Sequence, residues 1–439
     1  MGCSRGTAKL EVLLPEDVAT THNAALSPTL KRFGAKIVVL AFVSELYSAI
    51  RSRFHQSFPY DSTFSWENSG SDLRIFEPRF VAFHTPHFWD IGPYPFTYPA
   101  PLAPVYWLIY QIPHYVEVYL VLGIAILVAW AWYFATKLSA YGISRIGGFV
   151  ALLTFLGMAW PVRFLLQLGN TEMLVTLILG VGILAAMRGR WTLGAVLIGL
   201  AASMKLFPFV LFGLMLSQRK YRALAWGVAS AAISTVASLA LLGPTVMEAQ
   251  QHIRDGLSFI KQVFVLLRVP DSLEFSHSLF NLVKVAVTVF VHSRQPVASA
   301  ARSLHEMLLM ESVLHVYMAV VAVAGIGLYF LRLQRLPLLN QVFALTVCAV
   351  VLPPFSADYT LVHLLVPLGL LLVFAAEAWS RGQQPRGLGL CFTCLALIFT
   401  KEAFFELKYH FDAQVRTVAL LVLLAAASHY RFEREGDPA

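Results

Sequence analysis

Apolar runs of about 15 to 22 residues recur along this chain from Phe33 to Tyr430, and short groups of Arg and Lys separate them. A helix needs about 20 such residues to cross a hydrocarbon layer about 30 Å thick. The runs are continuous rather than alternating, so they fit helices and not the strands of a β-barrel. Because 58% of the residues are apolar and 13% are charged, one soluble core cannot bury this surface. The sequence predicts an all-α polytopic membrane protein and excludes a soluble enzyme and a disulfide scaffold.

The formal charge of +8 comes from 33 Lys and Arg against 25 Asp and Glu. The basic residues do not form one patch, as a nucleic-acid-binding surface would. They sit between the apolar runs, which is typical of cytoplasmic loops. We therefore use them to orient the chain, and we predict no nucleic-acid partner. The groups are Lys31/Arg32, Lys137/Arg145, Arg188/Arg190, Arg219/Lys220/Arg222, Arg332/Arg335, Arg381/Arg386 and Arg431.

The order of the runs predicts one membrane domain, residues 33–430, between a cytoplasmic segment at 1–32 and a cytoplasmic tail at 431–439. We expect about ten full spans together with short re-entrant pieces. The expected spans are Phe33–Ile50, Tyr115–Phe134, Ile146–Trp160, Met173–Met187, Tyr221–Leu242, Val313–Leu331, Leu338–Leu352, Tyr359–Ala376, Leu388–Thr400 and Val415–Tyr430.

Two long outer segments, residues 51–99 and 243–311, follow when the basic groups are placed in the cytoplasm. The run Pro99–Ile112 covers only roughly 21 Å as a helix, so it is expected to enter the membrane without crossing it. A crossing at Phe275–Val291 would move the later basic groups outside, so we expect an interfacial or recessed helix there. The same orientation predicts an outer turn at Arg163–Glu172.

Lys205 joins two apolar pieces, Trp191–Met204 and Leu206–Leu216, and the residues just before the first piece and just after the second are basic. Each piece is too short to cross fully, so we predict a hairpin whose tip lies in a recess that opens to the outer side. A charge there is costly unless it meets water or an anion, and a lipid phosphate would suit an ammonium group. The alternative is a snorkelling lysine that marks a helix end.

Asp72 follows Ser-Gly-Ser in the first outer segment. A carboxylate held over a lipid recess can act as a general base for a sugar hydroxyl, and the alternative is a helix N-cap. His84 and His87 have a spacing that could fit a metal, but an aromatic-rich interfacial loop accounts for them better. Asp358 lies in a Pro-rich polar turn, where a capping role is the simplest interpretation.

Short motifs along the chain also occur in a characteristic order. The strongest is Gly-Leu-Ala-Ala-Ser-Met-Lys-Leu-Phe-Pro at 199–208. The others are the outer segment with Asp72 and Phe-Thr-Tyr-Pro-Ala-Pro at 96–101, Leu-Gly-Asn-Thr-Glu at 168–172, Ser-His-Ser-Leu-Phe-Asn at 276–281, and Pro-Pro-Phe-Ser-Ala-Asp-Tyr at 353–359. In this order they resemble glycosyltransferase family 87, the polyprenol-phosphate-mannose-dependent mannosyltransferases. The resemblance covers the chain from about Phe33 to Tyr430.

The resemblance implies a GT-C fold with an active site on the extracytoplasmic face, a lipid-linked sugar phosphate as donor and an inverting single displacement. Asp72 matches the acid of the first outer loop, which acts as the base in that family. The implied donor-phosphate and substrate-binding residues are Lys205, Asn170, Glu172, Tyr98, His277, Asn281, Asp358 and Tyr359. The chain has Gly-Asn-Thr-Glu at 169–172 where the family usually has Gly-Gln-x-Asn. It also has Ala357 and Asp358 where related members carry Trp and His, so sugar and acceptor stay open.

We expect a plasma (inner) membrane enzyme that moves a hexose such as mannose from polyprenyl phosphate to a glycolipid or glycan acceptor. Its partners would be the donor, the acceptor and membrane lipids. No cofactor and no metal are expected, because a lysine can neutralise a monophosphate leaving group. Alternatives are a lipid or glycolipid transporter or flippase, and a GT-C enzyme with another sugar or a protein acceptor. Asp61 and Asp90 share the loop of Asp72, and either could be the base.

Overall fold

The computed structural model describes residues 70–91, 94–266, 276–292, 300–400 and 412–432. These residues form helices and no strand, with one isolated β-bridge between Ser276 and Ala357, which confirms the all-α prediction for the described part of the chain. The predicted span Phe33–Ile50 and the candidate base Asp61 lie outside the described residues.

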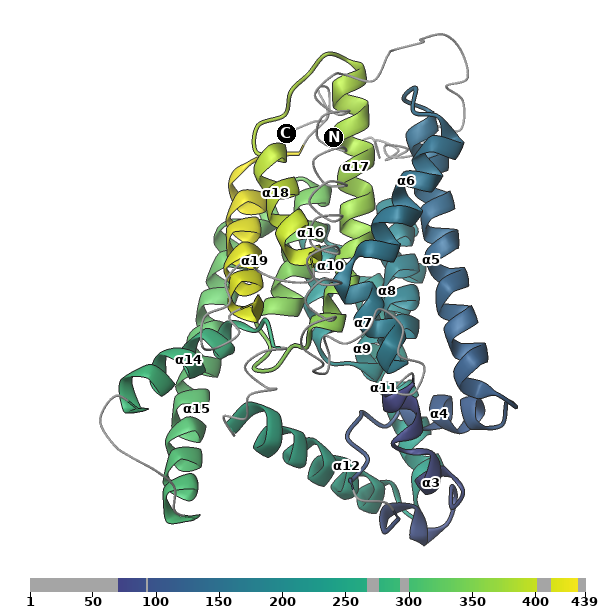
Figure 1. Ribbon diagram of the computed structural model, residues 1–439, viewed down its shortest axis with the longest axis vertical. Coiled ribbons are helices and arrows are strands. Elements are labelled where there is room, and N and C mark those ends of the chain that lie inside the picture. Colours follow the sequence, from purple (N-terminus) through teal and green to yellow (C-terminus); the bar gives the residue numbers. More distant parts are fainter. Residues whose placement is uncertain (1–69, 92–93, 267–275, 293–299, 401–411, 433–439) are drawn as a thin grey trace, which may run out of the picture.

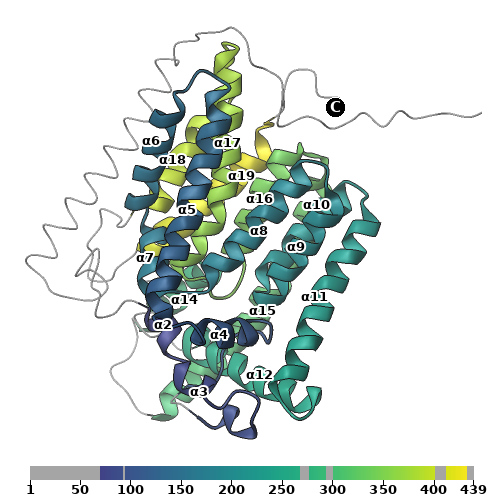
Figure 2. The same ribbon diagram turned by 90° about the vertical axis from the view of Figure 1, so that its right-hand side faces the viewer.

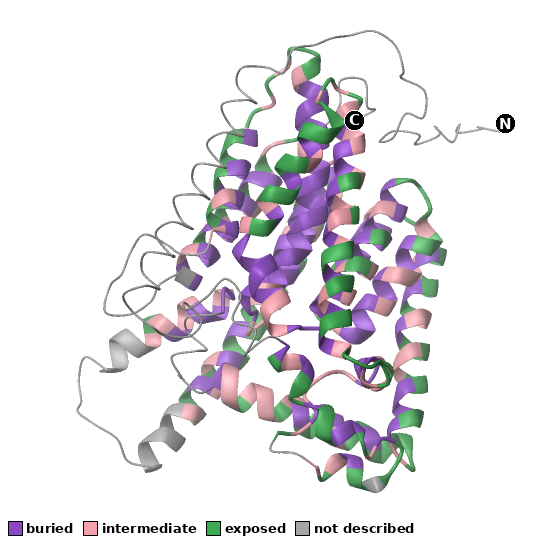
Figure 3. Cartoon of the chain, turned by 45° about the vertical axis from the view of Figure 1, so that its right-hand side comes forward, coloured by how far each residue is buried: buried purple, intermediate pink, exposed green. Residues whose placement is uncertain are grey.

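Four described helical segments are long and apolar enough to cross a membrane. They are helix α5 at Tyr115–Ser139, helix α11 at Tyr221–Leu242, the segment Met307–Arg335, and the segment Asp358–Ser380. The third consists of most of α15 (Ala300–Leu331) with η5 (Leu333–Arg335), and the fourth consists of η6 (Asp358–Leu364) and α17 (Leu365–Ser380). In the most apolar stretch of Asp358–Ser380, 94% of the residues are buried, whereas in that of Met307–Arg335 only 11% are. Met307–Arg335 therefore exposes apolar side chains, as a lipid-facing helix does. Figure 3 shows the buried residues concentrated on the central helices.

A bent pair forms a fifth candidate span. Helix α6 (Arg145–Met158) and helix α7 (Trp160–Leu168) meet at 63°. Pro161 lies in the first turn of α7, where a missing N–H costs nothing. The predicted outer turn at Arg163–Glu172 is therefore wrong over its first half, because α7 continues through it to Leu168. The sequence predicts a turn there because the segment lies between the expected spans Ile146–Trp160 and Met173–Met187, but Arg163 is a buried residue of α7.

The remaining apolar helices are 11 to 18 residues long, which is shorter than the roughly 20 residues that a full crossing typically takes. Among the described residues, helix length therefore supports four or five spans, and the count of ten stays a prediction. These helices are α8 (Glu172–Met187), α9 (Trp191–Met204), η3 with α10 (Phe207–Phe212 and Gly213–Ser217), α16 (Leu338–Val351), α18 (Leu388–Phe399) and α19 (Asp412–His429).

Helices α9 and α11 pack with their backbones in direct contact. A Cβ atom on Gly199 would lie 2.0 Å from the carbonyl oxygen of Gly227, so no larger side chain fits at this crossing. Small residues of this kind let membrane helices approach closely. Figure 2 shows α8, α9 and α11 as neighbouring, roughly parallel helices. Helix α9 begins at Trp191 and ends at Met204, so Lys205 follows it directly.

Short helices gather at one end of the bundle, the lower end in Figures 1 and 2. The expected short run after the first outer segment is the nine-residue helix α4, and the expected recessed helix is the 14-residue α14, which is not among the candidate spans. Phe76, Phe80, Phe96 and Tyr106 pack edge to face or stacked, and this aromatic core holds the first segment together. The helices are α2 (Ser71–Arg74), α3 (Glu77–Phe80), η2 (Pro86–Trp89), α4 (Leu102–Tyr110), α12 (Val246–Ile260), η4 (Lys261–Leu266) and α14 (Leu279–His292).

Candidate active site

Asp72 is positioned by a short helix that docks on the end of α7. Helix α2 begins after Gly70, whose φ of +74° suits glycine and whose N–H donates to the carbonyl of Gln167 at 2.8 Å. Gly169 lies so close that a Cβ there would approach Gly70 Cα at 2.9 Å. The N-cap position of α2 is Gly70, and no side chain caps the helix. The Asp72 carboxylate therefore does not cap its own helix, and it turns towards α7 and α8 instead.

The partner of Asp72 is the buried amide of Asn170. Asn170 Nδ2 donates to Asp72 Oδ2 at 2.6 Å and lies 3.2 Å from the Tyr98 hydroxyl. Asn170 Oδ1 accepts the backbone N–H of Glu172, and the Tyr119 hydroxyl donates to the Asn170 carbonyl at 2.7 Å. These bonds fix the orientation of the amide, so the amide in turn holds the carboxylate of Asp72 in one place.

Lys205 follows the last residue of α9 and has an extended backbone conformation. Its Nζ atom lies 3.1 Å from Glu172 Oε2 and 4.5 Å from the centre of the Tyr98 ring. The other Glu172 oxygen lies 2.6 Å from Nε2 of His363, and Nδ1 of His363 lies 3.1 Å from the Thr176 hydroxyl. The Lys205 side chain is 16% exposed, so its ammonium points inward rather than snorkelling to a surface.

Tyr98 connects the two halves of this cluster, because it contacts Asn170 with its hydroxyl and Lys205 with its ring face. Burial raises the pKa of Asp72, and the hydrogen bond from Asn170 and the charge of Lys205 oppose that rise. A carboxylate with a raised pKa accepts a proton more readily than an exposed one, which is the property that a general base needs.

A second buried cluster surrounds Asp358. Its Oδ2 atom accepts from the Trp160 indole at 3.0 Å and from the Arg416 guanidinium, and Oδ1 lies 3.3 Å from Nδ1 of His277. The interpretation of Asp358 as a turn cap is wrong, because the N-cap of η6 is Ala357 and no side chain caps that element. The carboxylate is instead held by partners from three other parts of the chain, and His277 Nε2 lies 3.1 Å from the Ser356 hydroxyl.

The second cluster attaches the outer segment 276–281 to the bundle. Ser276 forms the β-bridge with Ala357, and the backbone N–H of His277 donates to the backbone carbonyl of Ser356. The side-chain amide of Asn281 donates to the Ser276 carbonyl. Tyr359 follows Asp358 and stacks on Phe164 of α7, with ring centres 5.9 Å apart. Asp358 and Tyr359 therefore connect this cluster to α7, the helix against which α2 docks.

The structure thus sorts the predicted site residues into two groups. Asp72, Tyr98, Asn170, Glu172 and Lys205 form one polar cluster, and His277, Asn281 and Asp358 belong to the other. Tyr359 follows Asp358 in the chain, but its side chain forms a hydrogen bond with Asn170 of the first cluster.

Sequence reasoning missed several residues of these clusters, among them His363, Arg416 and Trp160. His363 and Arg416 are ionisable residues inside apolar runs, and that alone marks a candidate functional position. For Trp160 there is no comparable signal, because an indole in an apolar helix is ordinary.

The other polar residues of the first outer segment lie elsewhere. His84 Nδ1 is 3.0 Å from the Leu241 carbonyl, while His87 and Asp90 are exposed and lie 3.9 Å apart. Asp90 therefore does not share the cluster of Asp72. Among the described residues, no three His, Cys, Asp or Glu side chains are grouped as a metal site would require.

Comparison with known proteins confirms the resemblance seen in the sequence. The family model of glycosyltransferase family 87 matches residues 96–400, which is more than half of the chain. The matched interval contains Tyr98, Asn170, Glu172, Lys205 and the residues around Asp358, whereas Asp72 and Arg416 lie outside it. A search of curated proteins finds no relative that matches this chain.

Proposed function

Because the chain belongs to glycosyltransferase family 87, and is thus a membrane glycosyltransferase, we propose that it transfers a hexose such as mannose from polyprenyl phosphate to a glycolipid or glycan acceptor. The transfer inverts the anomeric centre. The observation that carries this proposal is one polar cluster that offers a carboxylate, Asp72, and an ammonium, Lys205, with Tyr98 in contact with both halves. Family membership favours this enzyme over the transporter or flippase alternative.

In the proposed step, Asp72 accepts the proton of an acceptor hydroxyl while that oxygen attacks C1 of the sugar. The bond between C1 and the phosphate oxygen breaks, and polyprenyl phosphate leaves with the bonding electron pair. Inversion needs the base on the face of the sugar opposite the leaving group, so one carboxylate is sufficient and no covalent intermediate forms. Asn170 acts as a positioning residue, because its amide orients the Asp72 carboxylate.

Lys205 is the proposed partner of the leaving phosphate. Its ammonium has three N–H donors, and the contact with Glu172 uses one of them, which leaves donors for phosphate oxygens. Glu172 is held by His363, so the ammonium is already oriented before the donor binds. A charge that is fixed in advance stabilises the developing negative charge without reorganisation during the reaction.

Two further points belong to the proposal. The basic groups between the spans orient the cluster towards the extracytoplasmic face of the plasma membrane, in a GT-C fold with about ten spans. Glu172 and Asp358 differ from the residues that the family usually has at these positions, and such differences can change which sugar and which acceptor are used. A GT-C enzyme with another sugar or a protein acceptor is therefore the second candidate.

The test is a transfer assay with purified full-length protein, a set of radiolabelled polyprenyl-phosphate sugars and a total membrane lipid extract. We expect label to move from a polyprenyl-phosphate hexose to a new glycolipid or glycan. Asp90→Asn serves as the control variant, since Asp90 is exposed and outside the cluster. Transfer only from nucleotide sugars, or label that moves only to protein, would contradict the proposed donor or acceptor respectively.

A further inference from the structure

Two basic turns that are about thirty residues apart in sequence line one cavity at the end of the bundle remote from Asp72. The cavity measures about 680 Å³ and is formed by the turn between α8 and α9 and the turn between α10 and α11. Its ten lining residues include four cations and no acid. The cations are Arg190, Arg219, Lys220 and Arg222.

The two turns are built alike. Gly189 and Arg219 both have a left-handed backbone, with φ of +76° and +55°. The N–H of Arg190 donates to the Ala185 carbonyl, and the N–H of Lys220 donates to the Met215 carbonyl in the same way. The tight packing of α9 on α11 at Gly199 then sets the two turns side by side. The charges meet because of this packing, which their positions in the sequence do not reveal.

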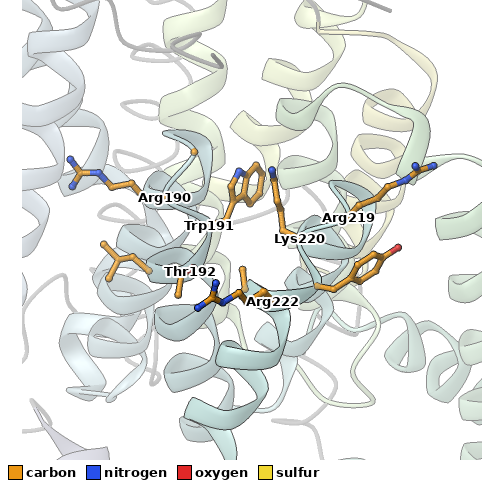
Figure 4. A pocket seen from close by; sticks show the side chains of 10 residues that line it. Arg190, Trp191, Thr192, Arg219, Lys220 and Arg222 are labelled. Atoms are coloured by element: carbon orange, nitrogen blue, oxygen red, sulfur yellow. The ribbon is translucent and has the colours of Figure 1, made fainter. Parts of the chain in front are cut away.

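Figure 4 shows how the side chains are arranged around the cavity. Lys220 lies beside Trp191, and Arg222 reaches towards Thr192, so two cations border the space between the turns. Arg190 and Arg219 extend on the two outer flanks. The cavity also takes in the first turns of α9 and α11, whose N–H groups have no acceptor within their own helices and carry a partial positive charge.

A second, almost wholly apolar cavity of about 580 Å³ adjoins the first, because Arg190 and Leu193 line both. It extends along α8 from Ala185 to Met173, and α5 forms another wall. A cationic space that continues into an apolar one matches an amphiphile with an anionic head and a hydrocarbon chain. A free phosphate would use only the first cavity, so the joined shape favours a lipid.

We propose that this end of the bundle binds a membrane phospholipid with an anionic, phosphate-bearing headgroup, held by Lys220 and Arg222, and that the second cavity takes one of its acyl chains. The basic groups place the site in the cytoplasmic leaflet. Its headgroup half is distinct from the glycosyl-transfer site, because α9 separates Trp191 from Lys205 by 14 residues, or about 21 Å of helix. The far end of the apolar half reaches Thr176, whose hydroxyl contacts His363.

The proposal is tested by native mass spectrometry of the full chain in detergent, titrated with phosphatidylglycerol, phosphatidylcholine and inorganic phosphate. We compare the double variant Lys220→Gln/Arg222→Gln with Arg145→Gln/Arg386→Gln, which removes two exposed cations predicted to face the same side. Lys220 and Arg222 line the cavity and pair directly with the headgroup phosphate in this proposal, whereas Arg145 and Arg386 are not among the lining residues. The first double variant should therefore bind phosphatidylglycerol up to about thirtyfold more weakly, and the second should bind like the parent protein.

Ala125→Trp tests the apolar half, since Ala125 is an exposed lining residue of the second cavity, and it should weaken lipid binding while inorganic phosphate binding is unchanged. Equal losses in the two double variants would mean non-specific attraction and would overturn the proposal. Equal affinity for phosphatidylcholine would contradict recognition of an anionic headgroup. Binding of inorganic phosphate as tight as that of lipid would show a soluble-anion site instead.

Discussion

Replacing Lys205 with Met tests two roles of its ammonium, the ion pair with Glu172 and the proposed stabilisation of the leaving phosphate. The change leaves the Glu172 carboxylate buried with His363 as its remaining partner. Breaking a buried ion pair from one side costs about 3–5 kcal/mol. Because His363 remains at 2.6 Å and the Lys205 side chain is 16% exposed, we expect about 2–3 kcal/mol. At about 2 °C per kcal/mol for a long chain, the melting temperature should fall by about 5 °C.

The effect on turnover should be larger than the effect on stability. A preorganised group that stabilises developing charge is worth about 10²- to 10³-fold in rate, and Lys205→Met should lose that factor in kcat for hexose transfer. The assays are thermal unfolding in detergent and single-turnover transfer from polyprenyl-phosphate sugar. Lys261→Met is the matched control, because both side chains of its ion pair with Glu311 are 37% exposed, so its loss should change the melting temperature much less than the loss of Lys205.

The double variant Lys205→Met/Glu172→Gln decides between the roles. The neutral amide that replaces the Glu172 carboxylate no longer needs a cation, so the melting temperature should recover towards that of the parent protein while turnover stays low. If the double variant regained turnover together with stability, Lys205 would serve only as the partner of Glu172, and its role at the phosphate would be refuted.

Two further outcomes follow from the packing and the electrostatics. The Asn170→Ala variant loses a hydrogen bond that lowers the pKa of Asp72, so the pKa of Asp72 should be higher in the variant. Because the base works only after Asp72 has lost its proton, the rate should rise at a higher pH in the variant than in the parent protein. The measurement is the pH profile of kcat/KM, and an unchanged profile would contradict this expectation. Gly199→Ala should lower the melting temperature, because the new Cβ meets the Gly227 carbonyl. At Gly157 a new Cβ has open space, so Gly157→Ala should raise stability by up to about 1 kcal/mol. Equal melting temperatures of the two variants would disprove the packing argument.

Several elements could be predicted because each depends on a local pattern. The run Tyr221–Leu242 is apolar throughout and lies between Lys220 and Gly243, and helix α11 has the same bounds. The two short pieces around Lys205 were also expected, since a lysine cannot continue an apolar run. The expected span Ile146–Trp160 ends close to the bend between α6 and α7, but the helix α7 beyond it was not predicted, because Arg163 interrupts the apolar pattern there.

Long-range contacts could not be predicted in the same way. Asp358 bonds to Trp160, which is 198 residues away, and to Arg416, and a single sequence contains no pattern that pairs them. The contact between Asn170 and Asp72 is similar, because it depends on α2 docking against α7 through two glycines. The family motifs pointed to most of the residues that form these clusters, and only the three-dimensional packing sorts them into two groups.

The most direct test of the general-base assignment is turnover by the Asp72→Asn variant, measured beside donor binding and beside Asp61→Asn and Asp90→Asn. The amide keeps the shape of the side chain but cannot accept the proton. We predict that Asp72→Asn loses about 10²- to 10⁴-fold in rate and still binds the polyprenyl-phosphate sugar, while the Asp90→Asn variant turns over like the parent protein. Parent-like turnover by Asp72→Asn, with Asp61→Asn or Asp90→Asn inactive, would move the base to that residue. Parent-like turnover by all three variants would contradict a base in the first outer segment.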